Sequence, residues 1–488
     1  MTARPLRADL VLFGRVWTGD RERPRARAVA VLGGRIAAVG DEAEILRLRG
    51  AATEVLGGRD ATILPGFVDA HLHLLALARR AEEVDCSRES VRSVAELVAK
   101  IRAAAASRPP GSWIRAFGYD EFFLEEKRPP RVADLDAAAP AHAVRLLHRT
   151  GHAAVLNTVA FQRLGMAPCE VIYEPAGLLR GRIPAPSADE AKRLVAAASD
   201  RLLASGITMF HDPSPGQSAA DIERLRAWVE EGTIRQRVIA LGASADFEPS
   251  DRASRWFRHA GVKIMIGEAD DADEVAAQVA AADRRGAQVA LHAVEGAALV
   301  VAIEALRRLG PARTRARRHR IEHAALCPPP LCEAIGESGA AVVTHPGFLR
   351  RFGEKYRSEL RREEEDWLYP LRRFLDSGVP LAFGSDAPIA PPSPLDNVSA
   401  ALLRESEGGS RLGPSQRILA AEALALHTQG GAWVGGLESI CGSLAPGRLA
   451  DLVVLDRDPL EVPPAEIAAI RVRATVIEGR VVWRRGDV

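Results

Sequence analysis

The central part of the chain alternates between helix-like and strand-like patterns of hydrophobic residues. Each amphipathic stretch is followed by a short apolar run; one stretch, SADEAKRLVAAASDRLLASG, opens with Ser187 and Glu190 at capping-box spacing and stops at Gly206. Eight strand-like runs result: FVDAHLHL, ITMFHD, RQRVIALGAS, GVKIMIG, AQVALHA, RHRIEHA, AAVVTHP and VPLAFGSDAP. Eight alternating units predict an α/β fold of the TIM (β/α)₈ barrel type. An open doubly wound sheet is the alternative, but it would more often carry a Gly-rich phosphate loop, and neither G-x-G-x-x-G nor a Walker sequence occurs.

The two ends of the chain follow a strand pattern instead. Stretches such as ADLVLFGRVWTGD near the start and IRVRATVIEGRVVWRR near the end carry turn signals, and Glu478 and Gly479 mark a hairpin turn. Neither end has enough strands to be stable alone. We therefore expect residues 1–64 and 437–488 to pair into one small β-domain.

The segment between the first and second strand-like runs is too long for a simple connection. It spans roughly residues 85–190 and holds the helical stretch VRSVAELVAKIRAAAAS, a Pro-rich segment and strand-like pieces such as AVRLLHR. We interpret it as a small α/β domain inserted into a barrel that otherwise covers residues 65–436.

Composition narrows the class of protein. The chain has 488 residues, 47% of them apolar and 26% charged, as in soluble globular proteins, and its length suits a large barrel with additions. A net charge of +1 gives no strong electrostatic field that would attract nucleic acid or a membrane surface. No apolar run approaches the roughly 18 residues that a membrane-spanning helix needs. The five cysteines are scattered and odd in number, which favours a reduced, cytoplasmic protein. The oligomeric state stays open, a homodimer included.

Residues able to bind a metal gather at the ends of the strand-like runs. Active sites of such barrels lie at the C-terminal ends of the strands, and half of the 12 histidines stand there. The residues at these ends are His71, His73, His211, Asp212, Lys263, His292, His323, His345 and Asp386. Because side chains at i and i+2 of a strand share a face, His71 and His73 are expected to present both imidazoles to one side.

These residue types indicate a hydrolytic metal centre. Imidazoles and carboxylates bind Zn²⁺ or a similar divalent ion, here one or two per chain. A catalytic ion keeps an open position for water and lowers the pKa of that water to about 7. Asp386 is then the candidate general base and acid, because its carboxylate can take the proton and return it to a leaving amine.

Lys263 is unusual in its place. Only five of the 65 basic residues are lysines, and this one lies in the apolar run VKIMI, where a buried ammonium beside a cation is costly. A lysine amine can react with CO₂ to give a carbamate, an anionic ligand able to bridge two metals, whereas arginine cannot. We favour this carbamylated lysine over a lysine that extends to the barrel rim or pairs with Asp270.

The order His-x-His, Lys, His, His and Asp along these runs resembles the amidohydrolase superfamily. More narrowly, the chain resembles the family 3 amidohydrolases, which include N-substituted formamide deformylases. The matching stretches span nearly the whole chain: ILPGFVDAHLHL, AFGYDEFF, RTGHAAVLNTVAF, SGITMFHD, HRIEHA, GSDAP and CGSLAPGRLADLVVLD. The resemblance implies a β-sandwich built from both termini, a metal-bearing barrel and a small inserted domain.

The resemblance also implies roles for individual residues. The implied metal ligands are His71, His73, Lys263 as the carbamylated bridge, His292, His323 and Asp386. The residues expected to face the substrate are Tyr119, Asp120 and His152, the last within a Gly-His-x-x-x-x-Asn stretch that ends at Asn157, and, from their strand-end positions, His211 and His345. The chain departs from the family pattern at His345, where a Gln or another small polar residue is expected before the proline.

Together these features predict a metal-dependent hydrolase of a non-peptide carbon–nitrogen bond, of amide or N-formyl type, in a small-molecule substrate. Metal-bound hydroxide would attack the carbonyl. The alternative within enzymes is a deaminase of a cyclic amidine, which would work with one metal ion and no carbamate. A catalytically inactive barrel that acts as a binding protein is the third interpretation, and the presence of every expected ligand argues against it.

Overall fold

The computed structural model describes residues 7–173, 175–179, 181–243, 247, 254–267 and 269–486. The chain divides into two compact units, which we call the main unit (Met1–Leu74 with Ala196–Val488) and the inserted unit (Leu75–Val195). The inserted unit is somewhat wider than the range of roughly 85–190 that the sequence pattern indicates. No helix of the described ranges is long and apolar enough to cross a membrane.

The main unit contains an eight-stranded parallel sheet that is nearly closed into a barrel, which confirms the predicted fold class. The strands, in their order around the sheet, are β5 (Phe67–Asp69), β11 (Ile207–Asp212), β12 (Arg237–Gly242), β13 (Phe257–Met265), β14 (Gln288–Glu295), β15 (Arg320–Leu326), β16 (Ala341–Thr344) and β17 (Leu381–Phe383). A hydrogen bond of 3.0 Å from Ala70 N to Phe383 O links the two outer strands. The C-terminal ends of all eight strands therefore meet at one end of the barrel.

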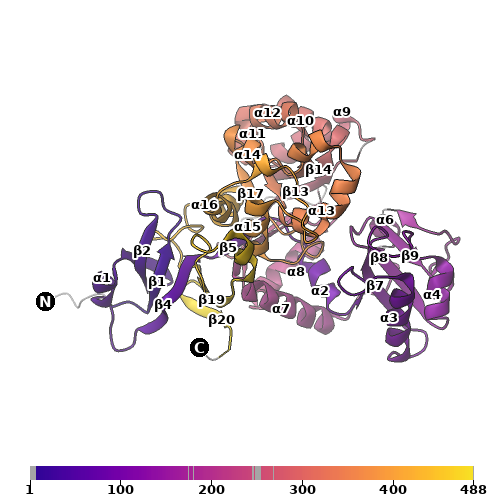
Figure 1. Ribbon diagram of the computed structural model, residues 1–488, viewed down its shortest axis with the longest axis horizontal. Coiled ribbons are helices and arrows are strands. Elements are labelled where there is room, and N and C mark those ends of the chain that lie inside the picture. Colours follow the sequence, from indigo (N-terminus) through magenta and orange to yellow (C-terminus); the bar gives the residue numbers. More distant parts are fainter. Residues whose placement is uncertain are drawn as a thin grey trace. The chain divides into compact units, whose positions relative to one another are not determined.

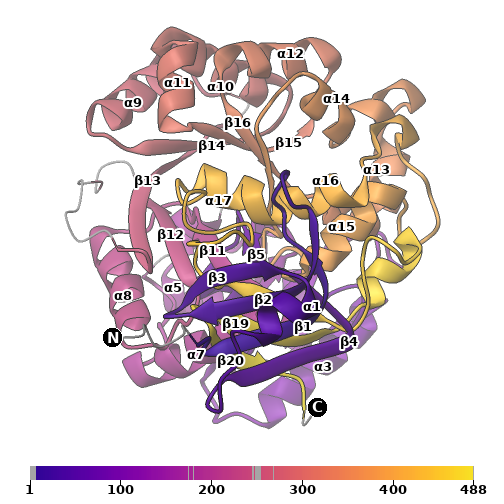
Figure 2. The ribbon, with the colours of Figure 1, turned by 90° about the vertical axis from the view of Figure 1, so that its left-hand side faces the viewer.

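Helices alternate with these strands, as the pattern predicts. They are α7 (Ala188–Ala204), α8 (Ala219–Glu230), α9 (Ala272–Arg284), α10 (Gly296–Leu309), α11 (Pro311–Arg317), α12 (Pro329–Ser338), α13 (Gly347–Glu359), α14 (Leu371–Asp376), α15 (Pro394–Leu403), α16 (Ala420–Ala425) and α17 (Gly431–Val434). Figure 2 shows α9, α10, α11 and α12 gathered beside β14 and β16. The predicted capping box of α7 is present, with Ser187 and Glu190 each donating a backbone N–H to the other's side chain at 3.2 Å.

The first barrel strand is shorter than the pattern indicates. It ends at Asp69, so His71 and His73 lie beyond the strand rather than within it. The backbone pairing nevertheless continues, because Leu72 N donates a hydrogen bond of 3.0 Å to His211 O. Leu72 is fully buried, and the two imidazoles still point to a common side.

Residues from both chain ends form one seven-stranded sheet in the main unit. Its strands, in order, are β20 (Arg480–Arg484), β19 (Val472–Ile477), β18 (Leu452–Leu455), β4 (Glu54–Pro65), β1 (Leu10–Trp17), β2 (Arg25–Leu32) and β3 (Arg35–Gly40), with the short helix α1 (Glu42–Leu46) beside them. Figure 1 shows the indigo N-terminal strands next to the yellow C-terminal ones. The predicted hairpin turn joins β19 to β20, with positive φ at Glu478 and Gly479.

This terminal sheet curves around an apolar core. Ile36 N donates to Arg448 O at 2.8 Å and Ala450 N donates to Gly34 O at 2.9 Å, so the edge strand β3 returns to the segment before β18. The enclosed core draws residues from both chain ends. The two ends therefore bury one common core, which neither could do alone.

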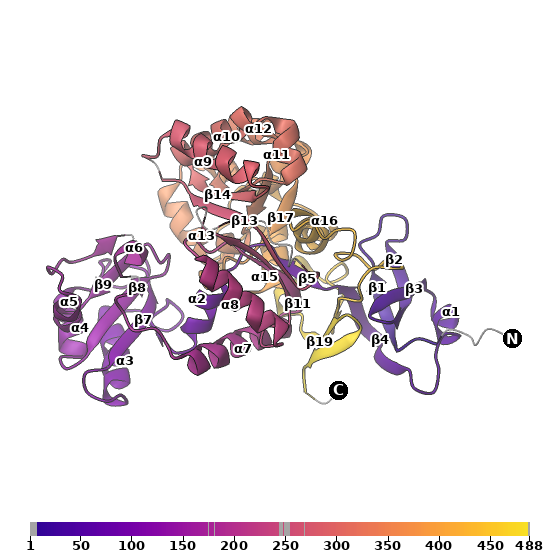
Figure 3. The ribbon, with the colours of Figure 1, turned by 180° about the vertical axis from the view of Figure 1, so that it is seen from behind.

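The inserted unit is a small α/β structure of its own. Its sheet runs β10 (Ile172–Tyr173), β9 (Ala153–Leu156), β8 (Ala143–His148), β7 (Trp113–Tyr119) and β6 (Val84–Asp85). Its helices are α2 (Leu74–Arg80), α3 (Val94–Ala106), α4 (Val132–Ala138), α5 (Thr158–Leu164) and α6 (Pro175–Leu179). Figure 3 shows α3, α4 and α5 beside β7, β8 and β9.

A buried arginine ties the barrel to the terminal sheet within the main unit. Arg237 in β12 is fully buried, and its Nε and Nη2 donate to the two carboxylate oxygens of Asp451 at 2.9 and 3.1 Å. Nη2 also donates to Glu478 Oε1 at 3.1 Å, and Nη1 donates to Arg255 O at 2.9 Å. Such a bidentate pair supplies orientation as well as attraction.

We predict that Arg237→Ala destabilises the protein strongly, because it leaves the Asp451 carboxylate buried without its partner. The expected loss is about 3–5 kcal/mol in the free energy of unfolding, measured by urea unfolding followed by circular dichroism. Arg361→Ala is the control: its side chain is 68% exposed, and the expected change stays within about 0.5 kcal/mol. Equal, small changes in both variants would contradict a structural role for the Arg237 pair.

Candidate metal centre

Two histidines and an aspartate converge where the first and eighth barrel strands end. His73 Nε2 lies 3.1 Å from Asp386 Oδ1, and His71 Nε2 lies 3.5 Å from the same oxygen. His71 and Asp386 are buried, and the His73 side chain is 20% exposed. Residues more than 300 positions apart thus form one group, with an opening at His73.

A second group lies beside the first, within β14 and β15. His323 Nε2 lies 3.0 Å from His292 Nδ1, and the ring of His323 is centred 5.1 Å from that of His71. Lys263 in β13 is buried, and its Nζ has no hydrogen-bond partner in the described ranges. The charge of Lys263 acts on both His71 and His323, so the amine lies near both groups.

Hydrogen bonds on the far side of the rings decide which nitrogens carry hydrogen. His71 Nδ1 contacts a Glu322 carboxylate oxygen, which only accepts, so this nitrogen donates. His73 Nδ1 lies 2.8 Å from Ser214 Oγ, and the Ser214 hydroxyl donates its hydrogen to Asp212 Oδ1. His73 therefore also donates through Nδ1, and in the neutral form of either ring Nε2 carries the lone pair.

These tautomers leave electron pairs facing each other across the centre. The Nε2 atoms of His71 and His73 both face Asp386 Oδ1, and His71 Nε2 and Asp386 Oδ1 have no hydrogen-bond partner among the described residues. Burial lowers the pKa of His71 well below its ordinary value, so this ring stays neutral and brings no proton to the contact. Nitrogen and oxygen donors arranged in this way fit a divalent cation of the Zn²⁺ type.

A buried charge network supports the centre from below. Glu322 in β15 is fully buried and accepts from both His71 Nδ1 and Arg320 Nε, the latter at 2.6 Å. Arg320 donates in turn to His211 Nδ1 at 2.8 Å and to Ala70 O at 3.2 Å. The Glu322 charge is thus compensated, and its carboxylate holds the His71 ring in one orientation.

The backbone is strained at two of the converging residues. His323 has a φ of 73° and Asp386 a φ of 55°, in the left-handed region that costs non-glycine residues on the order of 1–3 kcal/mol each. Next to Asp386, a Cβ on Gly384 would lie only 2.7 Å from His71 N and Cβ, so only glycine fits there. Such strain persists where the surrounding structure fixes the side chains, as it does here.

Burial also shifts the acidity of the charged groups. It lowers the pKa of Lys263 to about 8, although the nearby Glu322 carboxylate opposes the shift, so a fraction of the amine is neutral near pH 8. Burial by itself would raise the pKa of Asp386. Attraction from His71 and His73, when these imidazoles are protonated, acts in the opposite direction, and the pKa of Asp386 lies below its ordinary value.

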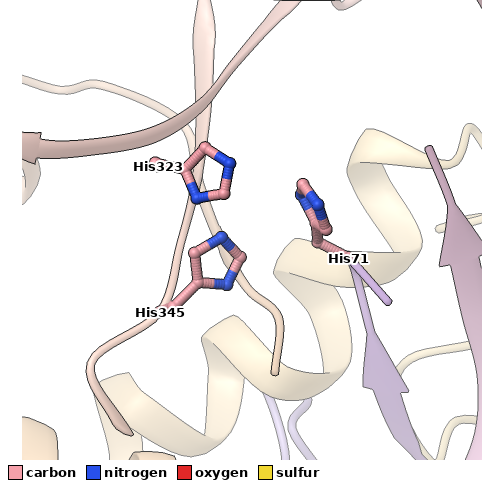
Figure 4. Close-up of side chains that lie close together, drawn as sticks. All are labelled: His71, His323 and His345. Atoms are coloured by element: carbon pink, nitrogen blue, oxygen red, sulfur yellow. The ribbon is translucent and has the colours of Figure 1, made fainter. Parts of the chain in front are cut away.

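The remaining strand-end histidines take different places. His345, after β16, lies with the centre: its ring is centred 5.0 Å from His71 and 4.8 Å from His323, and Figure 4 shows the three rings facing one another. His211 accepts from Arg320, and its Nε2 lies against Gly435, the residue that follows α17. The structure therefore brings His345 to the centre and His211 to the network below it.

The residues of the inserted unit that are predicted to face the substrate are described by their surroundings within that unit. Asp120 is buried, accepts from Phe122 N at 3.0 Å and pairs with Arg149. Tyr119 is buried, and burial raises the pKa of its phenol, whereas His152 is exposed. Their contact with substrate stays a prediction.

Asn157, from the same predicted stretch, has a local structural role. Its Oδ1 accepts from Val144 N at 2.9 Å and from Ala160 N at 3.0 Å, which caps α5. Its Nδ2 donates to two further backbone carbonyls, so every hydrogen-bonding group of this amide is used inside the unit.

The sequence reasoning missed Glu322 and Arg320, which the matched stretch HRIEHA contains. The available signal was a pair of opposite charges at i and i+2 in an otherwise apolar strand, which places both side chains on one face. It also missed Ser214, which relays between His73 and Asp212 and has no pattern of its own.

The chain is similar to known proteins over nearly its whole length. A family model described as the amidohydrolase family matches residues 58–483. An N-substituted formamide deformylase of Arthrobacter pascens is 27% identical over 98% of this chain and 99% of its own length, and the protein LONG AFTER FAR-RED 3 of Arabidopsis thaliana is 25% identical over 97% and 91%. The crystal structure of an uncharacterised metal-dependent hydrolase from Pyrococcus furiosus has 25% identity and a TM-score of 0.74, covering 93% of this chain and all of that one.

A more distant solved structure shows the fold alone. An atrazine chlorohydrolase from Arthrobacter aurescens, complexed with zinc, has 16% identity and a TM-score of 0.54, covering 97% of this chain and 95% of that one. The family model spans most of the chain, including the strand ends from β5 to β17. This chain therefore belongs to the amidohydrolase family.

Proposed function

We propose that this protein is a metal-dependent hydrolase of a non-peptide carbon–nitrogen bond, of amide or N-formyl type. The observation that carries the proposal is the contact between two imidazole lone pairs and the Asp386 carboxylate, which a divalent cation would satisfy. The similarity to an N-substituted formamide deformylase over nearly the whole of both chains supports this bond type.

The ligand groups divide between two neighbouring metal positions. One would be held by His71, His73 and Asp386, and the other by His292 and His323. Lys263, buried near both groups, would bridge the positions as a carbamate. The carbamate replaces an ammonium that would otherwise be buried beside cations, which removes an electrostatic cost.

The residues of the chain would act in a defined order. A divalent ion, when bound, polarises a carbonyl and lowers the pKa of water. The ionised Asp386 carboxylate would accept one proton from the attacking water and later deliver it to the leaving nitrogen. For an N-substituted formamide the products are formate and an amine, so one water molecule is consumed and the proton count balances.

We predict that metal content depends on Lys263. Zinc per chain, measured by plasma mass spectrometry on protein grown with zinc and bicarbonate, is expected near two in the wild type and lower in Lys263→Ala, because the bridge is lost. Lys192→Ala, at an exposed lysine of α7, is the control and should match the wild type. About one ion in wild type and variant alike would contradict the bridged pair and favour the mononuclear deaminase; no metal in either would contradict the metal centre itself.

Glu322→Gln tests the support beneath His71. The amide removes the anionic acceptor that fixes His71 Nδ1–H, so zinc affinity is expected to fall by about 10–100-fold, measured by competition with a chelator. Glu363→Gln changes a side chain that is 67% exposed and should leave the affinity unchanged. Wild-type affinity in Glu322→Gln would show that the carboxylate does not position the ligand.

Asp386→Asn tests the proton carrier. With N-substituted formamides as substrates and formate release as the readout, kcat is expected to fall by at least about 10²-fold, since an amide cannot accept the proton. Asp376→Asn, at a side chain 66% exposed, is the matched control. Unchanged kcat in Asp386→Asn would exclude this role, and a zinc-loaded wild type inactive on all formamides and simple amides would contradict the proposed bond type.

A further inference from the structure

The histidine after the seventh barrel strand has a fixed tautomer. His345 is fully buried, and its Nδ1 lies 3.0 Å from Gly384 O. A carbonyl oxygen only accepts, so Nδ1 carries the hydrogen and Nε2 of the neutral ring carries the lone pair. His345 Nε2 is itself buried and has no hydrogen-bond partner in the part of the chain that the structure describes.

A second set of hydrogen bonds holds the carbonyl that orients this ring. Asn397 in α15 donates from Nδ2 to the same Gly384 O at 3.0 Å and lies 3.0 Å from His427 Nε2. Asn397 Oδ1 accepts from Gly347 N at 2.9 Å, directly after the His345 segment. The direction of the Nε2 lone pair is therefore fixed by a connected network.

The groups around that nitrogen are the imidazoles of the metal centre. One ligand atom from each of His71, His323 and His345 lies within 4.8 Å of the others, and all three residues are buried (Figure 4). The ring of His345 also packs beside Phe348, with centroids 5.5 Å apart, which closes that side to water. A buried acceptor without a donor is costly, and a cation is the partner that several converging acceptors can share.

We propose that His345 Nε2 is an additional metal ligand, on the side of the centre where His71 and His323 face each other. This inference rests on the proposed function and deepens it. The family resemblance predicts a Gln or another small polar residue at the strand-seven position, so the imidazole of His345 would be an additional ligand.

An unpartnered buried nitrogen alone does not mark a ligand, because His211 Nε2 also lacks a partner in the described ranges; Arg320 donates to His211 Nδ1, so that Nε2 carries the hydrogen and cannot bind a metal. At His345 the unpartnered atom is instead the lone pair. In His319 both nitrogens are paired, Nδ1 accepting from Val289 N at 3.0 Å and Nε2 facing Asp283.

The extra imidazole has a consequence for metal selection. Imidazole suits Zn²⁺, Co²⁺ and Ni²⁺, whereas Mg²⁺ and Mn²⁺ favour oxygen ligands. A centre with one more nitrogen donor should therefore hold Zn²⁺ and Co²⁺ more tightly without gaining affinity for Mg²⁺.

Titration of the metal-free protein with Co²⁺ tests the inference without depending on activity. The visible absorption of Co²⁺ reports its ligands, so His345→Gln is expected to change the spectrum and to weaken Co²⁺ and Zn²⁺ binding at least tenfold, about 1.4 kcal/mol. His319→Gln is the matched control, since it removes a buried imidazole at the other end of the barrel and should preserve the wild-type spectrum and affinity. Circular dichroism establishes that each variant is folded.

The outcomes separate this inference from the proposed function. A wild-type Co²⁺ spectrum and affinity in folded His345→Gln would overturn the ligand role of His345 and leave the metal-dependent hydrolase intact. Failure of the wild type itself to bind Co²⁺ or Zn²⁺ would overturn both. If His345→Gln does not fold, the smaller replacement His345→Asn enters the same titration and is judged by the same two results.

Discussion

Two imidazole nitrogens face one carboxylate oxygen at the end of the barrel, and the surrounding structure is organised around that contact. His71, His73 and Asp386 present acceptors to one another over 3.1 to 3.5 Å, an arrangement that is unfavourable unless a cation lies between them. Glu322 and Ser214 bind the opposite nitrogens of the two rings, so each ring is held with its lone pair forward.

Keeping such groups together requires a rigid support. The Glu322 carboxylate is buried with Arg320, and Arg320 reaches His211 and the backbone of Ala70, so the charge beneath the centre is neutralised by a connected set of hydrogen bonds. The positive φ at His323 and Asp386 is further strain that this support maintains. The parallel barrel contributes by bringing the strand ends to one place.

Charge explains the uneven use of lysine and histidine near the centre. A guanidinium suits the positions where Arg320 and Arg237 meet carboxylates in fixed geometry, because its planar fork donates in several directions. Lys263 occupies a place where its Nζ has no such acceptor among the described residues, which is consistent with a side chain that changes its charge by reaction. His345 directly follows the seventh strand, where its imidazole is buried beside those of His71 and His323.

The sequence alone determined the eight alternating units, the pairing of both chain ends, the inserted α/β segment and the residues at the strand ends, because each leaves a local signal of hydrophobic period or residue type. It did not determine that β5 stops at Asp69, that His211 lies beneath the centre while His345 faces it, or that Asn157 is the N-cap residue of α5. Those facts depend on strand register and on partners distant in sequence, such as Glu322 for His71 and Gly384 for His345. A side chain's direction is set by what it packs against, and only the closed barrel brings those partners together.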